Sequence, residues 1–163
     1  MTMVPSRIVS GGQTGVDRGA LDAALAKGFP CGGWCPQGRK AEDGVIPSRY
    51  PLQELAGAGY RQRTHRNVMD ADATLIIYFD ALPGGTGETA RYCERLGKPM
   101  LSVDGTSTDP VTAAERAAGF LHANAVRILN VAGPRESQHH RAHDYAEAVI
   151  RIVLKRLQQG SQQ

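Results

Sequence analysis

The sequence predicts an α/β fold: a mostly parallel sheet with helices on both faces. Several short runs are apolar at every position, as is typical of strands buried on both faces. These runs alternate with segments of helical periodicity, the pattern of βαβ units. Glycine-rich turns stand between several strands and the helices that follow them. With 163 residues and 41% apolar residues, the chain fits one domain over 1–158, with a disordered tail at 159–163.

The strands are expected where the apolar runs lie, at 7–11, 73–79, 99–104 and 126–133. The run ATLIIYF (73–79) is the clearest of them. The short apolar stretch FPCGGWCP (29–36) is expected to be extended. The segment 37–54 is polar and rich in Pro and Gly, which predicts a long loop, and such loops in compact domains are usually functional or mobile.

Helices are expected at 16–28, 61–71, 88–98, 109–123 and 141–158. Gly28 is placed to end the first helix, and Thr64 is a candidate N-cap of the second. Asp109 and Pro110 form a typical helix start, because Asp caps the free N–H groups and Pro fits the first turn. The glycines of LPGGTG (82–87) predict a turn before the third helix.

Composition excludes several classes of function. The formal net charge is only +3 and the basic residues are scattered, so no nucleic-acid partner is expected. No apolar run reaches the length of a membrane span, and the first residues lack the apolar stretch of a signal peptide, so we expect a cytoplasmic protein without a membrane partner. The three cysteines, Cys31, Cys35 and Cys93, fit neither a CxxC pair nor a common zinc site and are expected to be reduced thiols.

Three glycine-rich turns are predicted at the carboxyl ends of strands, where open α/β sheets bind ligands. Such turns let backbone N–H groups approach an anion, and the helix that follows adds partial positive charge. Their convergence predicts a site for a phosphate-bearing or other anionic small ligand. The candidate ligand-binding residues in these turns are Gly11, Gly12, Gln13, Thr14 and Gly15, then Gly84, Gly85, Thr86 and Gly87, then Gly133, Arg135 and Ser137.

None of the three turns is a Walker P-loop, because the spacing GxxxxGK[ST] is absent. One turn fits a dinucleotide-binding fingerprint loosely: Gly85, Gly87 and Ala90 follow a strand, and Asp104 stands at the end of the next strand. However, residues 79–83 separate the strand from these glycines, whereas the turn of a dinucleotide-binding fold is tight. NAD-type binding is therefore the weaker alternative.

Four arginines are candidates for recognising the anion, because guanidinium groups match phosphate oxygens in two-point fashion. They are Arg18, Arg39, Arg63 and Arg135, and Asn67 is a further candidate. Solvated surface charge is the alternative for each arginine, and it fits Arg135 least, since Arg135 directly follows a buried strand. Asp17 has two interpretations: it caps its helix or pairs with Arg18, or it faces the ligand.

Three histidines, His139, His140 and His143, lie close together before the last helix. Neither a cysteine nor a convincing set of carboxylates completes a metal site in the sequence, so we expect a solvated segment and no protein-coordinated metal. No Ser/His/Asp or Cys/His order indicates a nucleophile.

Five long motifs, in order, cover most of residues 7 to 137: SGGQTGVDRGALDAAL, GGWCPQGRKAEDG, YRQRTHRNVMDADATLI, PGGTGETA and LNVAGPRES. They resemble the putative molybdenum carrier family, also described as a circularly permuted YpsA-like branch of the Rossmann-type SLOG superfamily. The resemblance implies a Rossmann-like parallel sheet and a ligand similar to a nucleotide or to molybdenum cofactor (molybdopterin). It also implies a homo-oligomer, either a dimer or a tetramer.

PGGTGETA is also similar to the PGGxGTxxE motif of the LOG-type phosphoribohydrolases, which cleave nucleoside monophosphates into base and ribose phosphate. Here Glu88 and Arg91 stand where that motif has its Thr and its closing Glu. The departure removes the catalytic Glu but leaves phosphate binding intact. We therefore expect a carrier or binding protein for molybdenum cofactor or a nucleotide. The alternative is a nucleotide N-glycosidase in which Asp17 or Glu88 is the catalytic carboxylate.

Overall fold

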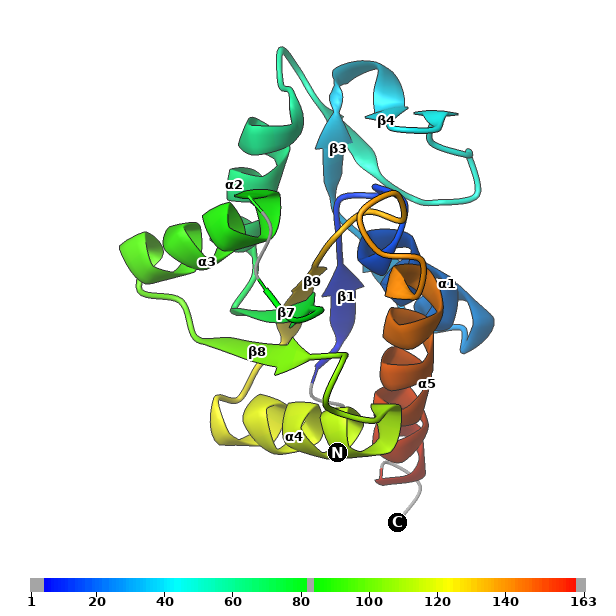
Figure 1. Ribbon diagram of the computed structural model, residues 1–163, viewed down its shortest axis with the longest axis vertical. Helices are drawn as coiled ribbons and strands as arrows, with labels where there is room; N and C mark the ends of the chain where they lie inside the picture. Colours follow the sequence, from blue (N-terminus) through cyan, green and yellow to red (C-terminus); the bar gives the residue numbers. More distant parts are fainter. Residues whose placement is uncertain (1–4, 82–83, 161–163) are drawn as a thin grey trace.

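A five-stranded parallel sheet forms the centre of the computed structural model, which describes residues 5–81 and 84–160 (Figure 1). The strand order is β2-β1-β9-β7-β8. The strands are β1 (Arg7–Val9), β2 (Cys31–Gly32), β7 (Ala73–Tyr78), β8 (Met100–Asp104) and β9 (Ile128–Ala132). Every pairing within this sheet is parallel, as the alternation of strands and helices predicts.

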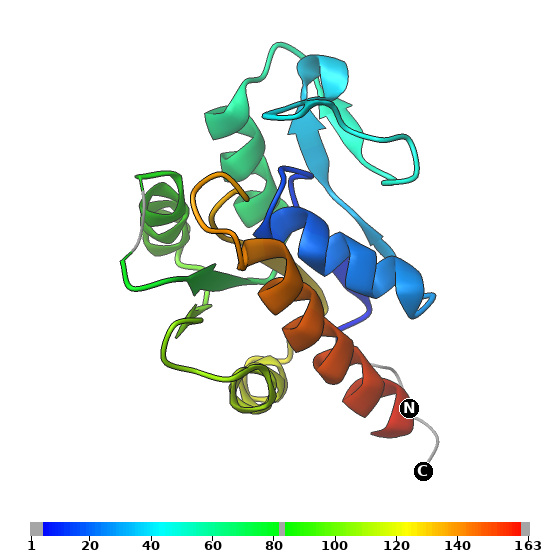
Figure 2. The ribbon, with the colours of Figure 1, turned by 45° about the vertical axis from the view of Figure 1, so that its right-hand side comes forward.

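Helices cover both faces of the sheet, so the predicted α/β class is confirmed (Figures 1 and 2). One face carries α1 (Val16–Ala26), α4 (Pro110–Ala123) and α5 (Ala142–Gly160). The other face carries α2 (Tyr60–Asp70) and α3 (Gly84–Leu96). Within the described ranges, no helix combines the length and the apolarity that a membrane crossing requires.

The last strand of the chain lies in the middle of the sheet, between β1 and β7. Asn130 of β9 is paired in register with Val9 on one side and with Thr74 on the other. This arrangement brings the carboxyl ends of three strands that are distant in sequence to one place. The chain leaves β9 toward α5 on one face and leaves β7 toward α3 on the opposite face (Figure 1). Such a reversal is the point where open α/β sheets bind ligands.

The main core lies between the sheet and α1, α4 and α5. Ile8, Leu75 and Val131 contribute from the strands, and each is at most 1% exposed. Five of the six residues of β7 are buried, which explains why this strand reads as an unbroken apolar run. Tyr145 of α5 is buried in the same cluster and donates its hydroxyl to the Thr108 carbonyl at 2.7 Å.

The segment 37–54, expected to be a long loop, is ordered around a second, smaller core. It contains the 3-10 turn η1 (Gln37–Arg39) and the antiparallel pair β4 (Lys40–Ala41) and β5 (Gly44–Val45). On its flanks β3 (Trp34–Pro36) pairs in parallel with β6 (Gln53–Leu55). The second core consists of Leu21, Cys35, Ala41, Ile46, Tyr50 and Leu52. Cys31, Cys35 and Cys93 are free thiols.

Three local predictions were wrong. Thr64 lies inside α2, where its hydroxyl donates to the Tyr60 carbonyl, and Gly59 is the N-cap. Of the turn expected at 82–87, residues 84–87 form the first turn of helix α3, where the backbone N–H groups have no partner within the helix, and 82–83 lie outside the described residues. The last helix continues to Gly160, so residues 159–160 of the expected tail are helical; 161–163 lie outside the described residues.

Candidate functional site

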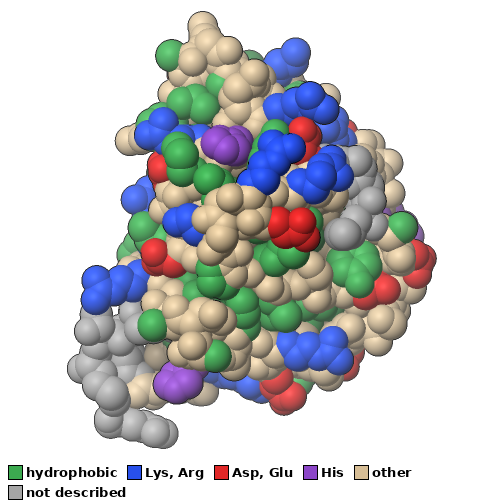
Figure 3. Space-filling view, turned by 90° about the vertical axis from the view of Figure 1, so that its left-hand side faces the viewer, with side chains coloured by type: hydrophobic (Ala, Val, Ile, Leu, Met, Phe, Trp, Pro, Cys, Tyr) green, Lys and Arg blue, Asp and Glu red, His purple; other side chains and the backbone are tan. Residues whose placement is uncertain are grey.

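A pocket of about 110 Å³ lies at the carboxyl edge of the sheet, where β1, β9 and β7 end. Its walls come from the turn after β1, the end of β9, the start of α3 and one side of α2. In Figure 3, Lys and Arg side chains gather in the upper part of the face that carries α2 and α3. The pocket is lined by Gly11, Gln13, Asp17, Tyr60, Arg61, Arg63, Thr64, Asn67, Thr86, Glu88, Thr89, Asn130, Val131, Ala132, Gly133, Arg135 and Gln138.

A buried ion pair forms the floor of the pocket. Arg63 of α2 lies 3.7 Å from the Asp17 carboxylate of α1 and donates to the Gly11 carbonyl at 2.7 Å. Asp17 also accepts the backbone N–H of Gln13 at 3.2 Å, so it is both a first-turn residue of α1 and a wall of the pocket. Burial raises the pKa of Asp17, although Arg63 opposes this, and burial lowers the pKa of Arg63.

Gln13 lines the pocket, and its side-chain amide has one donor without a partner among the described residues. Its Oε1 accepts the backbone N–H groups of Thr14 at 3.1 Å and Glu42 at 2.9 Å, which fixes the orientation of the amide. Its Nε2 is buried and has no hydrogen-bond partner among the described residues. A buried donor without a partner costs about 1–3 kcal/mol, so an acceptor that enters the pocket would stabilise this group.

Two further arginines, Arg61 and Arg135, line the pocket and differ in their partners. Arg61 pairs with Glu88 of α3 at 3.1 Å. The guanidinium of Arg135 lies over the Tyr60 ring, 5.3 Å from its centroid, and has no ion-pair partner among the described residues. With Arg63, the pocket holds three arginines against two carboxylates, which favours an anionic ligand.

The first turn of α3 closes the opposite side of the pocket. Thr86, Glu88 and Thr89 line it, and all three lie in the first two turns of this helix. The first N–H groups of a helix have no partner within the helix and carry partial positive charge. The glycines at 84, 85 and 87 therefore belong to the N-terminal turn of a helix rather than to a free loop.

Sequence analysis and structure agree on eight residues of the pocket, which come from five separate segments. The predicted residues that line it are Gly11, Gln13, Asp17, Arg63, Asn67, Thr86, Gly133 and Arg135, together with the candidate carboxylate Glu88. Asn67 lines the pocket while also holding β3, because its amide bonds both the N–H and the carbonyl of Trp34. Gly133 leaves no space for a side chain, since a Cβ would lie 2.5 Å from the Ile77 carbonyl oxygen.

The other predicted residues lie outside the pocket and hold the loops around it. Gly12 packs against Leu52, while Gly15 packs against the backbone after Pro134. Arg18 is engaged by Asp43 and by the Gly12 carbonyl. Gly87 does not line the pocket; the surroundings of Gly84 and Gly85 lie outside what the structure describes.

Arg39, also predicted as a ligand residue, is a structural clamp. Its guanidinium donates to four backbone carbonyls of the second core, those of Ile46, Pro47, Tyr50 and Leu52. These bonds close the segment 46–52 around the arginine. The sequence could not distinguish this role from anion binding, because both use the same guanidinium donors.

Thr14 and Ser137 join two loops through Glu42. The Glu42 carboxylate accepts the hydroxyl of Thr14 and, at 2.6 Å, that of Ser137. Burial would raise the pKa of Glu42, but the hydrogen bonds from Ser137 and Thr14 outweigh it and lower the pKa. Glu136 adds a backbone N–H to the Thr14 hydroxyl at 3.2 Å. The turns after β1 and β9 are thereby locked together beside the pocket.

Sequence analysis named Arg63 and Asn67 of α2 but missed eight other residues that line the pocket. Tyr60, Thr64 and Gln138 line the pocket, as do Arg61, Thr89, Asn130, Val131 and Ala132. A signal for α2 was present: Tyr60, Arg63, Thr64 and Asn67 recur at helical spacing and so share one face of the helix. Only the fold shows that this polar face turns inward.

The matches to known proteins cover most of the chain. A model of the circularly permutated YpsA SLOG family matches residues 8–154. The chain belongs to this family. A search of curated proteins found no match. Among solved structures, this member of the circularly permutated YpsA SLOG family is similar to a protein of Syntrophus aciditrophicus SB described as a putative molybdenum carrier protein. The identity is 37%, the TM-score is 0.91, and the match covers 94% of this chain and 98% of that chain.

The fold of the chain agrees with that of the solved relative. In this chain the strand that follows all the others in sequence, β9, pairs with β1 and β7 in the middle of the sheet. The family and its Rossmann-like fold are therefore established for this chain.

Proposed function

We propose that this protein binds a small phosphate-bearing ligand, either molybdenum cofactor or a nucleotide, and acts as a carrier or binding protein. The observation that carries the proposal is the set of unused donors that converge in one pocket. The buried Nε2 of Gln13 and the guanidinium of Arg135 lack an acceptor among the described residues, and the first turn of α3 faces them.

The ligand's phosphate fits this set of donors for chemical reasons. A phosphate offers several strong acceptor oxygens, and arginine matches two of them at once. The Arg63–Asp17 pair adds a fixed, buried dipole with its cationic end at the Gly11 turn. The proposal that the ligand is molybdenum cofactor is supported by the description of the Syntrophus relative. No bond from the protein to the metal is required, because the phosphate is sufficient to hold the cofactor.

Thermal unfolding with a ligand panel tests the proposal. Purified molybdenum cofactor, nucleoside mono- and diphosphates, inorganic phosphate and molybdate are added separately. A ligand present at 100 times its Kd stabilises the folded state by about 2.7 kcal/mol, which raises the Tm of a chain of this size by roughly 5–10 °C. Absence of any shift with all the phosphate-bearing ligands would contradict the proposal.

Arg135→Ala is the sharpest variant for this test. Its guanidinium supports no ion pair among the described residues, so the variant is expected to fold normally and to lose at least tenfold in affinity. Arg116→Ala is the matched control, because Arg116 is an exposed arginine on α4, outside the pocket. Equal effects of the two substitutions would show that net charge rather than the pocket binds the ligand.

A second candidate function, hydrolysis of a nucleotide's N-glycosidic bond, is favoured by one observation: both candidate carboxylates, Asp17 and Glu88, line the same pocket. A carboxylate beside the sugar would stabilise the positive charge that develops during cleavage. Incubation with a panel of nucleoside monophosphates, followed by chromatography for free base, tests it. Base release that is lost in Asp17→Asn or Glu88→Gln would favour the enzyme over the carrier.

A further inference from the structure

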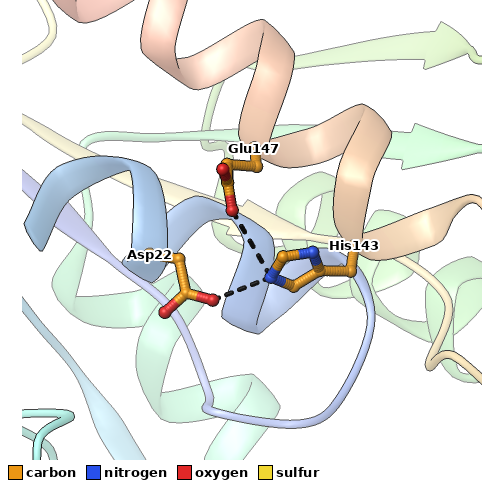
Figure 4. A group of neighbouring side chains, drawn as sticks. All are labelled: Asp22, His143 and Glu147. Atoms are coloured by element: carbon orange, nitrogen blue, oxygen red, sulfur yellow. Dashed lines mark hydrogen bonds and ion pairs between the residues drawn. The ribbon is translucent and has the colours of Figure 1, made fainter. Parts of the chain in front are cut away.

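Outside the pocket, a cluster of metal-ligating side chains lies where α1 meets α5. His143 of α5 directs its Nε2 at Asp22 of α1, with 2.7 Å between Nε2 and Oδ2 (Figure 4). The Oε2 of Glu147, one helical turn after His143, lies 3.6 Å from the same nitrogen. One ligand atom from each of the three residues lies within 4.8 Å of the others. We propose that Asp22, His143 and Glu147 bind a divalent transition-metal ion, with Zn²⁺ as the probe.

The spacing of the three atoms is close to that of a coordination shell. Zn–N and Zn–O bonds of about 2.0–2.2 Å place neighbouring ligand atoms of a tetrahedral site about 3.3 Å apart. The contact of His143 with Glu147, at 3.6 Å, is about 0.3 Å longer than this spacing, and the contact with Asp22, at 2.7 Å, is about 0.6 Å shorter. The three side chains are between 21% and 27% exposed, so water can complete the shell.

Each proposed ligand is held through the atom that does not face the cluster. The Tyr50 hydroxyl donates to Oδ1 of Asp22 at 2.7 Å. Arg151 donates to Oε1 of Glu147 at 3.0 Å. The Nδ1 of His143 lies 2.8 Å from the Asp144 carboxylate, the partner that orients many metal-binding histidines. The three outer contacts leave Oδ2, Oε2 and Nε2 directed at one another.

The fold brings the two helices unusually close at this level. A Cβ on Gly19, one turn before Asp22, would lie 2.3 Å from the His143 carbonyl oxygen. Because Gly19 has no side chain, α1 can approach α5 closely. Asp22 of α1 thereby meets His143 and Glu147, which follow it by 121 and 125 positions in the sequence.

The charges around the cluster also favour a cation. The arginines near it, Arg49 and Arg151, contact only the outer oxygens of its carboxylates. Among the described residues, the ion-pair partner of both inward oxygens is the His143 imidazole.

The donor set indicates which metal fits. A neutral imidazole nitrogen with two carboxylate oxygens suits Zn²⁺, Co²⁺ or Mn²⁺, whereas Mg²⁺ prefers oxygen ligands and keeps its water. The proposal is independent of the anion pocket, since none of the three residues lines it. Arg135→Ala should therefore leave metal binding unchanged.

Isothermal titration calorimetry of the chelator-treated full chain with Zn²⁺ tests the proposal. One equivalent is expected to bind. Asp22→Asn, His143→Gln and Glu147→Gln are each expected to weaken binding at least tenfold, because each removes a ligand. His140→Gln is the matched control, since His140 lies close by but stacks on His139 instead of entering the cluster. Co²⁺ is expected to produce a visible absorption band that is lost in His143→Gln and kept in His140→Gln.

Three outcomes would overturn the proposal. One is the absence of saturable binding of Zn²⁺, Co²⁺ and Mn²⁺ to the unmodified chain. Another is binding that survives both Asp22→Asn and Glu147→Gln, which are close in shape to the native side chains and are checked for folding by circular dichroism. The third is binding that depends on His140, which would place the metal on the exposed histidine segment.

Discussion

Replacing Gly15 by alanine should separate the two loops that close the pocket. Gly15 has φ 83° and ψ −131°, a backbone conformation that residues with a Cβ avoid. An alanine Cβ at this position would lie 2.4 Å from the Pro134 carbonyl oxygen and 2.7 Å from the Glu136 nitrogen. Both atoms are backbone, so neither can swing aside as a side chain would. The turn after β1 and the turn after β9 must therefore move apart.

The loss of stability in Gly15→Ala has two sources: backbone strain at the alanine and weaker hydrogen bonds between the two turns. The backbone strain alone is worth about 1–3 kcal/mol. Moving the two turns apart also stretches two hydrogen bonds between them. One runs from the Val16 N–H to the Pro134 carbonyl and is 3.2 Å long, and the other runs from the Glu136 N–H to the Thr14 hydroxyl. Each such bond contributes about 0.5–1.5 kcal/mol. We expect Gly15→Ala to lower the free energy of unfolding by about 3–5 kcal/mol.

Gly38→Ala is the control that isolates the contact from the strain. Gly38 also has a positive φ, 79° with ψ 7°, but no atom lies within 4 Å of a Cβ built on it. Its replacement should cost only about 1–2 kcal/mol, the penalty of the left-handed conformation. Urea denaturation of both variants measures the difference. If Gly15→Ala destabilises the protein no more than Gly38→Ala does, the argument that the two loops interlock is wrong.

Three further predictions concern buried polar groups. Asp17→Asn and Arg63→Met should each cost about 3–5 kcal/mol of stability, since each leaves one buried charge unpaired; a double variant that costs the full sum in urea denaturation would show that the pair is not coupled. Burial raises the pKa of Tyr145 to about 12, so the folded state holds this proton more tightly than the unfolded chain and stability should fall as the pH rises from about 10 toward 12. Urea midpoints at both ends of that range should decline less in Tyr145→Phe, and an equal decline would refute the assignment. Arg39→Lys should lower the Tm, because an ammonium group cannot reach four carbonyls at once, but ligand affinity measured below the Tm should be unchanged; a loss of affinity in the folded variant would restore a ligand role to Arg39.

The metal-ligating cluster shows where sequence reasoning stopped. The three histidines were visible as neighbours, and Glu147 stands four positions after His143, yet no complete set of ligands could be read from the chain. Asp22 comes from a different helix, α1, and reaches the cluster through the close packing at Gly19. His139, by contrast, stacks on Phe79 with 4.0 Å between ring centroids. Histidines that are adjacent in sequence thus point to different partners.

The sequence by itself determined the sheet, its helices and the edge of the sheet where the pocket lies, because these follow from local properties. Hydrophobic periodicity reports which residues are buried, and parallel strands bring their carboxyl ends, with the glycine turns, to one edge. The tertiary structure alone decided which of the four candidate arginines line the pocket and which are engaged elsewhere. Arg18, Arg39, Arg63 and Arg135 are chemically identical, and the first two are engaged by Asp43 and by backbone carbonyls. Arg63 and Arg135 line the pocket, because only packing determines which acceptors lie within reach of a guanidinium.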